Sequence, residues 1–297
     1  MFSYKSAILS EKTFISLTSL TISEFNDLIT TFSRQWEKHT GQEARDPKNG
    51  GRPPSLKTIE DRLFFILFYL KTYPLQEVIA YCFEINQGTA NVLIHQLSHI
   101  LKLTLVELGY VPARITEDMI KLLQLEGKQP YAIDATERPI IRPSNNEVQE
   151  MFYSGKKKHH TIKNNMIVGI NDRQIKYLGD THEGKKHDKK IAEEEHLALP
   201  AGSDLYQDTG FQGLIVEGVN TYQPKKKPKG KKLTDEEKSN NRLISSIRVV
   251  VEHVISGVKR CHIVKDIFRN TKSGYDDLVL ELSCALHNFR SHSRLEY

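Results

Sequence analysis

The first half of the chain repeats apolar residues at the period of an α-helix. A helix is predicted over residues 22 to about 38, with Thr21 and Glu24 in the spacing of a capping box. Three more helices are predicted between residues 56 and 101, and a short turn at residues 84–87 precedes the last of them. Its apolar face consists of Ala90, Leu93, Ile94, Leu97, Ile100 and Leu101. This layout is typical of a helix-turn-helix module and equally of a small helical bundle.

From residue 130 onward the pattern changes to short apolar runs with the length of strands. Strands are predicted over residues 131–136, 161–170, 174–179 and 203–208, and Asn171-Asp172-Arg173 forms a hairpin turn between the middle two. Helices are predicted over residues 187–199, 234–259 and 276–290. Strands followed by alternating helices and strands indicate an α/β domain.

These patterns divide the chain into five parts. An N-terminal helical segment, residues 1–40, precedes a polar, flexible and basic linker at residues 41–55, in which Gly50, Gly51, Pro53 and Pro54 follow one another closely. The all-α helix-turn-helix domain follows at residues 56–110, and a connector at residues 111–129 leads to the α/β domain, residues 130–297. A lysine-rich insertion at residues 224–234 interrupts that domain.

Composition excludes several classes of protein. Hydrophobic residues make up 38% of the chain and charged residues 27%, which is ordinary for a folded domain. The longest apolar run, residues 63–70, is far shorter than the ~20 residues that span a bilayer, so no membrane partner is expected. Three scattered cysteines favour neither disulfides nor a cysteine-based zinc site. We therefore expect a cytoplasmic protein.

The net charge of +5 is modest, but its distribution is uneven. Basic clusters occupy residues 156–160, 185–190 and 225–232. One such cluster is often a solvated loop, whereas three in one half of the chain favour a polyanionic partner. In the helical half, Gln87, Thr89, Asn91 and His95 project from the last predicted helix, where they could hydrogen-bond base edges or phosphates. Arg52, within Gly-Arg-Pro, could enter a minor groove.

Two predicted strands of the α/β domain end near a carboxylate, Asp134 and Asp208. A third acid, Glu252, lies on the polar edge of the predicted helix at residues 234–259, between Arg248 and Lys259. Carboxylates on rigid elements are what two-metal phosphodiester chemistry requires. Each acid alone is more often structural, and a salt bridge between Arg248 and Glu252 one helical turn apart would explain the helix equally well.

Five ordered motifs surround these acids. They are Ile133-Asp134-Ala135-Thr136-Glu137-Arg138-Pro139-Ile140, Tyr153-Ser154-Gly155-Lys156-Lys157-Lys158-His159-His160, Gly184-Lys185-Lys186-His187-Asp188, Gln207-Asp208-Thr209-Gly210-Phe211-Gln212-Gly213 and Arg248-Val249-Val250-Val251-Glu252-His253. Together with Gly51-Arg52-Pro53 and the helical module, they make most of the chain resemble bacterial insertion-sequence transposases of the D-D-E superfamily, in the IS-five-like branch akin to Harbinger transposases. Thr209 and Phe211 depart from that pattern, where a basic residue and a tyrosine are more frequent.

The resemblance implies an RNase H-like catalytic domain, with Asp134 on its first strand, Asp208 on its fourth and Glu252 on a later helix. It implies that these three acids bind two Mg²⁺ ions, which Mn²⁺ could replace. Water would hydrolyse a DNA strand at the end of the element, and the freed 3′-hydroxyl would attack target DNA without a covalent protein intermediate. His187, Asp188, Arg248 and Lys259 are expected to support the site.

The resemblance also implies the partners. Double-stranded DNA, both terminal inverted repeats and target, would contact Lys156, Lys157 and Lys158 and the insertion residues Lys225, Lys226 and Lys227. A homodimer that pairs two element ends is expected, in the bacterial cytoplasm with the nucleoid. Two alternatives remain open: a metal-dependent endonuclease that cuts without joining, and a domesticated DNA-binding protein whose catalytic domain is scaffold. The intact set of three acids speaks against the second.

Overall fold

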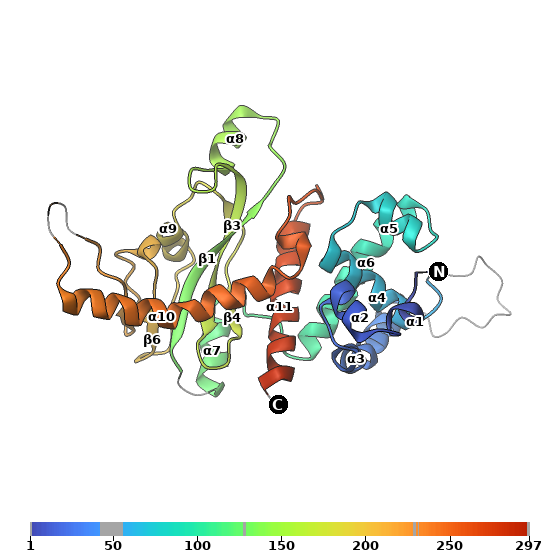
Figure 1. Ribbon diagram of the computed structural model, residues 1–297, viewed down its shortest axis with the longest axis horizontal. Coiled ribbons are helices and arrows are strands. Elements are labelled where there is room, and N and C mark those ends of the chain that lie inside the picture. The colour runs from blue at the N-terminus through green and yellow to red at the C-terminus, as the bar shows by residue number, and fades with distance from the viewer. Residues whose placement is uncertain (1, 42–55, 127–128, 228–229, 231, 296–297) are drawn as a thin grey trace. The chain divides into compact units, whose positions relative to one another are not determined.

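The computed structural model describes residues 2–41, 56–126, 129–227, 230 and 232–295 (Figure 1). Arg52 and almost all of the predicted linker lie outside the described residues. The chain forms two compact units. The first contains residues 1–111, 259–266 and 278–293, and the second contains residues 112–258, 267–277 and 294–297. The last helix, α11 (Tyr275–Leu295), therefore begins in the second unit and continues in the first.

The first unit is helical. Its helices are α1 (Tyr4–Ala7), α2 (Glu11–Thr18), α3 (Ile22–Thr40), α4 (Ile59–Thr72), α5 (Gln76–Cys82) and α6 (Gln87–Glu107), with a 3-10 turn at His262–Val264 and most of α11. α4 is the central helix, because all of its residues from Leu63 to Leu70 are buried. The predicted capping box starts α3: the Glu24 N–H donates to Thr21 Oγ1 over 3.1 Å, and the Thr21 N–H donates to Glu24 Oε2 over 2.8 Å.

The predicted helix-turn-helix pair corresponds to α5 and α6. Five of the six apolar positions predicted for α6 are buried, and Leu93 is half-buried. Asn86 caps α6 by accepting the Thr89 N–H over 2.7 Å. Of the polar side chains predicted on the outer face, Gln87 and Asn91 are exposed, whereas Thr89 and His95 are half-buried. Within the described ranges, no helix is long and apolar enough to cross a bilayer.

The second unit is built on a mixed sheet of seven strands. The strands are β1 (Tyr131–Pro139), β2 (Tyr153–Ser154), β3 (His159–Gly169), β4 (Ile175–Leu178), β5 (His182–Glu183), β6 (Asp204–Tyr206) and β7 (Asn220–Tyr222). β3 is antiparallel to β1, β2, β4 and β5, whereas β6 is parallel to β1 and to β7. The order β3-β1-β6-β7, with β4 on the far side of β3, is the sheet of the RNase H-like fold that the resemblance implies.

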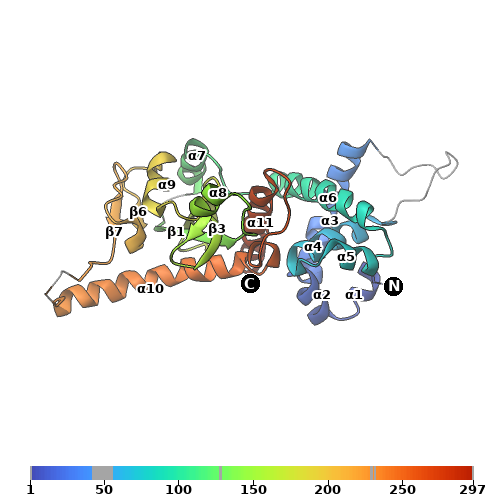
Figure 2. The same ribbon diagram turned by 90° about the horizontal axis from the view of Figure 1, so that it is seen from above.

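Helices flank this sheet: α7 (Thr116–Glu126), α8 (Asn146–Phe152), α9 (Asp188–Glu194) and α10 (Asp235–Val258). Figure 2 shows α10 on the opposite side of the sheet from α7 and α9. Successive strand residues point to opposite faces, so Tyr131 and Ile133 join the apolar core that contains Met119 of α7 and Ala192 of α9. Asp134 consequently points to the other face, which α10 covers.

Candidate active site

Asp134 lies on β1, and Asp208 follows the adjacent parallel strand β6, two residues after its last residue Tyr206. Tyr131 pairs with Leu205 and Ala132 pairs with Tyr206. Each aspartate follows two residues after the second pair, and parallel strands advance together along a sheet. The register therefore brings the chain at Asp208 close to Asp134 on β1. The expectation that Asp134 closes its strand is wrong, because antiparallel pairing with β3 carries β1 on to Pro139.

Arg248 of α10 lies between the two carboxylates. Its Nη1 is 3.4 Å from Oδ1 of Asp208, and its Nη2 is 4.0 Å from Oδ2 of Asp134. Only 12% of the Arg248 side chain is exposed, compared with 23% for Asp134 and 35% for Asp208. α10 packs against β1 and β6, and its buried residues Val251, Val254 and Val258 fix which side of the helix faces the sheet. The sheet and the helix thus form a half-buried anionic site around one cation.

The surroundings of Asp134 disfavour its ionised form. Burial raises the pKa of Asp134 above its ordinary value, and the carboxylates of Asp208 and Asp188 act in the same direction. The Ala135 N–H, 2.8 Å from Asp134 Oδ1, and the Arg248 guanidinium partly offset this rise in pKa. Crowded carboxylates favour additional positive charge beside them.

A tight turn holds the carboxylate of Asp208. Its Oδ1 accepts the Thr209 N–H over 2.5 Å and lies 3.2 Å from Thr209 Oγ1. The Asp208 carbonyl accepts the side-chain amide of Gln223 over 2.7 Å. Gln207, the residue before it, is fully buried, and neither its amide nitrogen nor its amide oxygen has a hydrogen-bond partner among the described residues.

Asp188, at the start of α9, is held against this turn. Lys163 of β3 is 2.9 Å from its Oδ1 and 3.8 Å from Oε1 of Glu137. A methyl group at Gly210 would lie 3.0 Å from Asp188 Oδ2, so the turn that follows Asp208 leaves room beside this carboxylate for no larger residue than glycine without a shift. The supporting role of Asp188 stays a prediction. His187 is exposed and makes no capping hydrogen bond at the start of α9.

Glu252 is not gathered with the two aspartates. It is exposed on α10, one turn after Arg248. Among the described side chains Arg248 pairs with the aspartates, and the alternative salt bridge between Arg248 and Glu252 is not formed. No group of three His, Cys, Asp or Glu side chains in the described part of the chain is arranged to hold a metal ion. Glu252 as third ligand therefore stays a prediction, and Lys259 belongs to the first unit.

Two of the predicted ligands nevertheless fit a divalent cation. Asp134 and Asp208 supply the hard oxygen donors that Mg²⁺ prefers. The guanidinium between them shows that positive charge is stabilised at this position. Burial is the main cause of the raised pKa of Asp134, and the carboxylates of Asp208 and Asp188 raise this pKa further.

The lysines predicted to meet DNA are exposed. Lys156, Lys157 and Lys158 form the turn between β2 and β3, where Ser154 Oγ accepts the Lys157 N–H over 3.2 Å. Lys225 pairs with Glu237 of α10, whereas Lys226 and Lys227 lie at the surface. The insertion continues into residues 228–229 and 231, which lie outside the described residues.

On α6, hydrogen bonds order some of the side chains predicted to meet DNA. Gln76 of α5 donates from its amide to Asn91 over 3.0 Å and accepts from Gln87 over 2.5 Å. Asn91 and Gln87 therefore present fixed amide groups on an exposed face. His95 and Thr89 are half-buried.

A helix-turn-helix pair, an RNase H-like sheet and two aspartates beside one arginine define a DNA-cleaving enzyme. The chain belongs to the DDE superfamily endonucleases, whose family model matches residues 133–288. A second model, the helix-turn-helix of DDE superfamily endonucleases, matches residues 54–107. The chain is also 28% identical over 244 residues to the "Probable transposase for insertion sequence element IS702" of Microchaete diplosiphon, covering 81% of this chain and 83% of that protein. No solved structure matches the chain.

Proposed function

We propose that this DDE superfamily endonuclease is the transposase of an insertion sequence. It binds the terminal inverted repeats of its element, hydrolyses DNA at their ends and joins the freed 3′-hydroxyl to target DNA. The observation that carries the proposal is that Asp134 and Asp208, on neighbouring parts of the sheet edge, both lie against the guanidinium of Arg248. The similarity to the transposase of Microchaete diplosiphon, which spans most of both chains, supports the same function.

In this proposal each residue of the site has its own role. Asp134 and Asp208 hold Mg²⁺, two ions in the active complex, and Mn²⁺ can substitute. Bound divalent cations lower the pKa of water for attack on the phosphodiester and stabilise the leaving oxygen. Glu252 completes the ligand set when DNA is bound. Arg248 then exchanges its carboxylate partners for a DNA phosphate, since its fork of donors suits either anion.

DNA is held by both units in this proposal. Asn91 and His95 of α6 contact the terminal repeat, together with Gln87, Thr89 and Arg52. Lysines 156–158 and 225–227 neutralise phosphates, which adds affinity through counterion release. Two copies of the chain pair the two element ends as a dimer. Because the substrate is chromosomal DNA, we place the protein in the bacterial cytoplasm with the nucleoid.

Two assays with the full chain test the function. Duplexes that carry the element ends should be cut in Mg²⁺, and pre-cleaved ends with a free 3′-hydroxyl should be joined to a second duplex. Asp134→Asn and Asp208→Asn should abolish both steps while DNA binding persists. Cutting without joining would identify an endonuclease, and binding without either step would identify a scaffold protein.

A further inference from the structure

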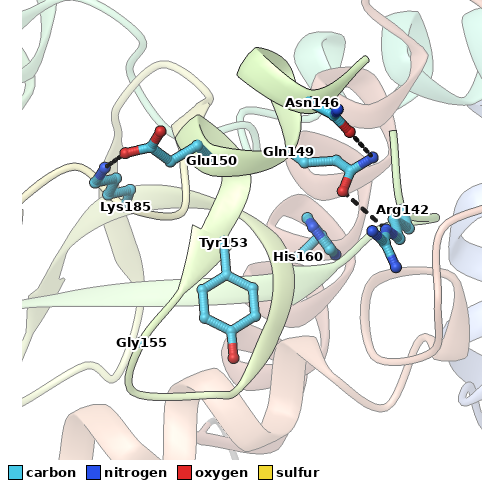
Figure 3. A pocket seen from close by; sticks show the side chains of 8 residues that line it. All are labelled: Arg142, Asn146, Gln149, Glu150, Tyr153, Gly155, His160 and Lys185. Carbon is cyan, nitrogen blue, oxygen red and sulfur yellow. Dashed lines mark hydrogen bonds and ion pairs between the residues drawn. The ribbon is translucent and has the colours of Figure 1, made fainter. Parts of the chain in front are cut away.

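A second site lies in the second unit, beside the turn that Lys156, Lys157 and Lys158 form between β2 and β3, called here the lysine turn. It is an open pocket of about 640 Å³ between α8, the β2–β3 turn and the chain around Lys185 (Figure 3). Neither Asp134, Asp208 nor Glu252 lines it. Gly155, which begins the lysine turn, does line it, so the pocket is continuous with the surface predicted to meet DNA phosphates.

An exposed aromatic ring stands in this pocket. Tyr153 is 42% exposed, which leaves much of its ring open to solvent. Its neighbour on β3 is His160, which pairs with it in register, and their rings meet edge to face with centroids 5.6 Å apart. His160 therefore supports the Tyr153 ring from one side. An open aromatic face beside a basic surface is suited to stacking a nucleobase.

Polar groups surround the aromatic pair. Arg142 Nε donates to Gln149 Oε1 over 2.9 Å, and Gln149 donates in turn to Asn146 over 3.5 Å. These hydrogen bonds orient the Arg142 guanidinium. Its Nη atoms have no partner among the described residues. On another side, Lys185 pairs with Glu150 over 2.6 Å, and both side chains are exposed. Figure 3 shows Tyr153 and His160 between these two cations.

We propose that this pocket receives one unpaired nucleotide of the DNA substrate. Its base stacks on Tyr153, its edge meets the Gln149 amide, and its flanking phosphates lie on Arg142 and Lys185. The continuity with the lysine turn favours a nucleotide that is still part of a strand over a free one. Moving a base out of a duplex costs least where it is already unpaired, so the pocket should favour DNA with an unpaired base. The proposal rests on the function proposed above.

The test compares two duplexes of otherwise identical sequence, one fully paired and one with a single unpaired nucleotide. The full chain should bind the duplex with the unpaired nucleotide about tenfold more tightly, a gain in affinity that one modest stacking contact supplies. Tyr153→Ala should remove this preference, and Tyr153→Phe should retain it because the ring remains. Met151→Ala is the matched control, since Met151 is exposed two residues earlier, on α8, but does not line the pocket.

A probe on the unaltered protein guards against a variant that fails to fold. A 5-iodouracil base at the unpaired position should photo-crosslink to Tyr153 or His160. Crosslinks only elsewhere, or a preference that survives in Tyr153→Ala, would overturn the pocket. Binding to paired duplex with no preference in the unaltered chain would also overturn it, while leaving the proposed function intact. Failure to bind either duplex would instead count against the proposed function itself.

Discussion

The Nη1 atom of Arg248 on α10 lies 3.4 Å from Oδ1 of Asp208, two residues after the end of β6. The same guanidinium reaches Asp134 on β1, with Nη2 4.0 Å from Oδ2. One cationic side chain thus neutralises the two carboxylates that a divalent ion would need. Arginine and metal ion compete for the same oxygens, so each should weaken the effect of the other.

The first prediction follows from this competition. Without divalent ions, Arg248→Met should be less stable than the unaltered chain by about 1–2 kcal/mol at neutral pH, because two neighbouring carboxylates lose their cation. Mg²⁺ should then raise the melting temperature of the variant more than that of the unaltered chain. Arg242→Met, at an exposed position of the same helix, is the control. Equal Mg²⁺ shifts in all three proteins would contradict the competition.

The second prediction concerns Glu252. Glu252→Ala should leave folding and DNA binding unchanged, because this side chain is exposed and forms no ion pair among the described residues. Cleavage of element ends in Mg²⁺ should nevertheless be lost, measured as nicked product on a denaturing gel. Glu236→Ala, also exposed on α10, should cut normally. A normal cutting rate in Glu252→Ala would remove Glu252 from the set of metal ligands.

The third prediction separates specific from general DNA contacts. Asn91→Ala and His95→Ala on α6 should weaken binding to the terminal repeat more than binding to random duplex, by about 1–3 kcal/mol for a lost base contact. Lys157→Ala should weaken both equally and reduce the dependence of affinity on salt. Titrations of both duplexes at several salt concentrations would show this. Equal losses on both duplexes for the α6 variants would demote α6 to a structural role.

Much of the fold could be predicted because its signals are local. The capping boxes at Thr21 and at Thr234 mark the starts of α3 and α10, and the apolar runs locate β1, β3 and β6. Elements without a buried stripe gave no such signal. α8 buries none of its residues, and all three residues of β7 are exposed. The helix predicted over residues 187–199 ends at Glu194, because Leu197 and Leu199 reach the core from irregular chain.

The site could be predicted only in part, for a similar reason. Asp134 and Asp208 could be predicted because each belongs to a recognisable sequence motif. The carboxylate partners of Arg248 could not be predicted, because they depend on how α10 packs against the sheet. The position of Lys163 inside an apolar run does not indicate a functional contact, yet its side chain is buried between Glu137 and Asp188. Arg138, within the first motif, is 1% exposed and donates to the Asp276 carbonyl over 2.6 Å. Such contacts join residues far apart in sequence, and no local pattern encodes them.

A buried carboxyl beside α9 offers a test of the second unit. Glu195 has only 7% of its side chain exposed and lies 3.5 Å from His182 Nε2. Burial raises the pKa of Glu195 to about 7, and the charge of Asp180 adds to this effect. The Asp180 N–H, the Tyr177 hydroxyl and Arg114 act against it. Burial also lowers the pKa of His182, so its protonation does not compensate the acid near neutral pH.

The fourth prediction is that Glu195→Gln changes how stability depends on pH. A raised pKa in the folded state contributes stability that is complete below the unfolded value near 4.5 and is lost as the pH rises through about 7. Glutamine is never charged and can still accept the Asp180 N–H bond, which spans 2.9 Å. The variant should therefore match the unaltered chain near about pH 4.5 and exceed its unfolding free energy by about 1–3 kcal/mol near pH 8. Urea unfolding across this range measures the difference, and parallel curves would show that Glu195 titrates normally.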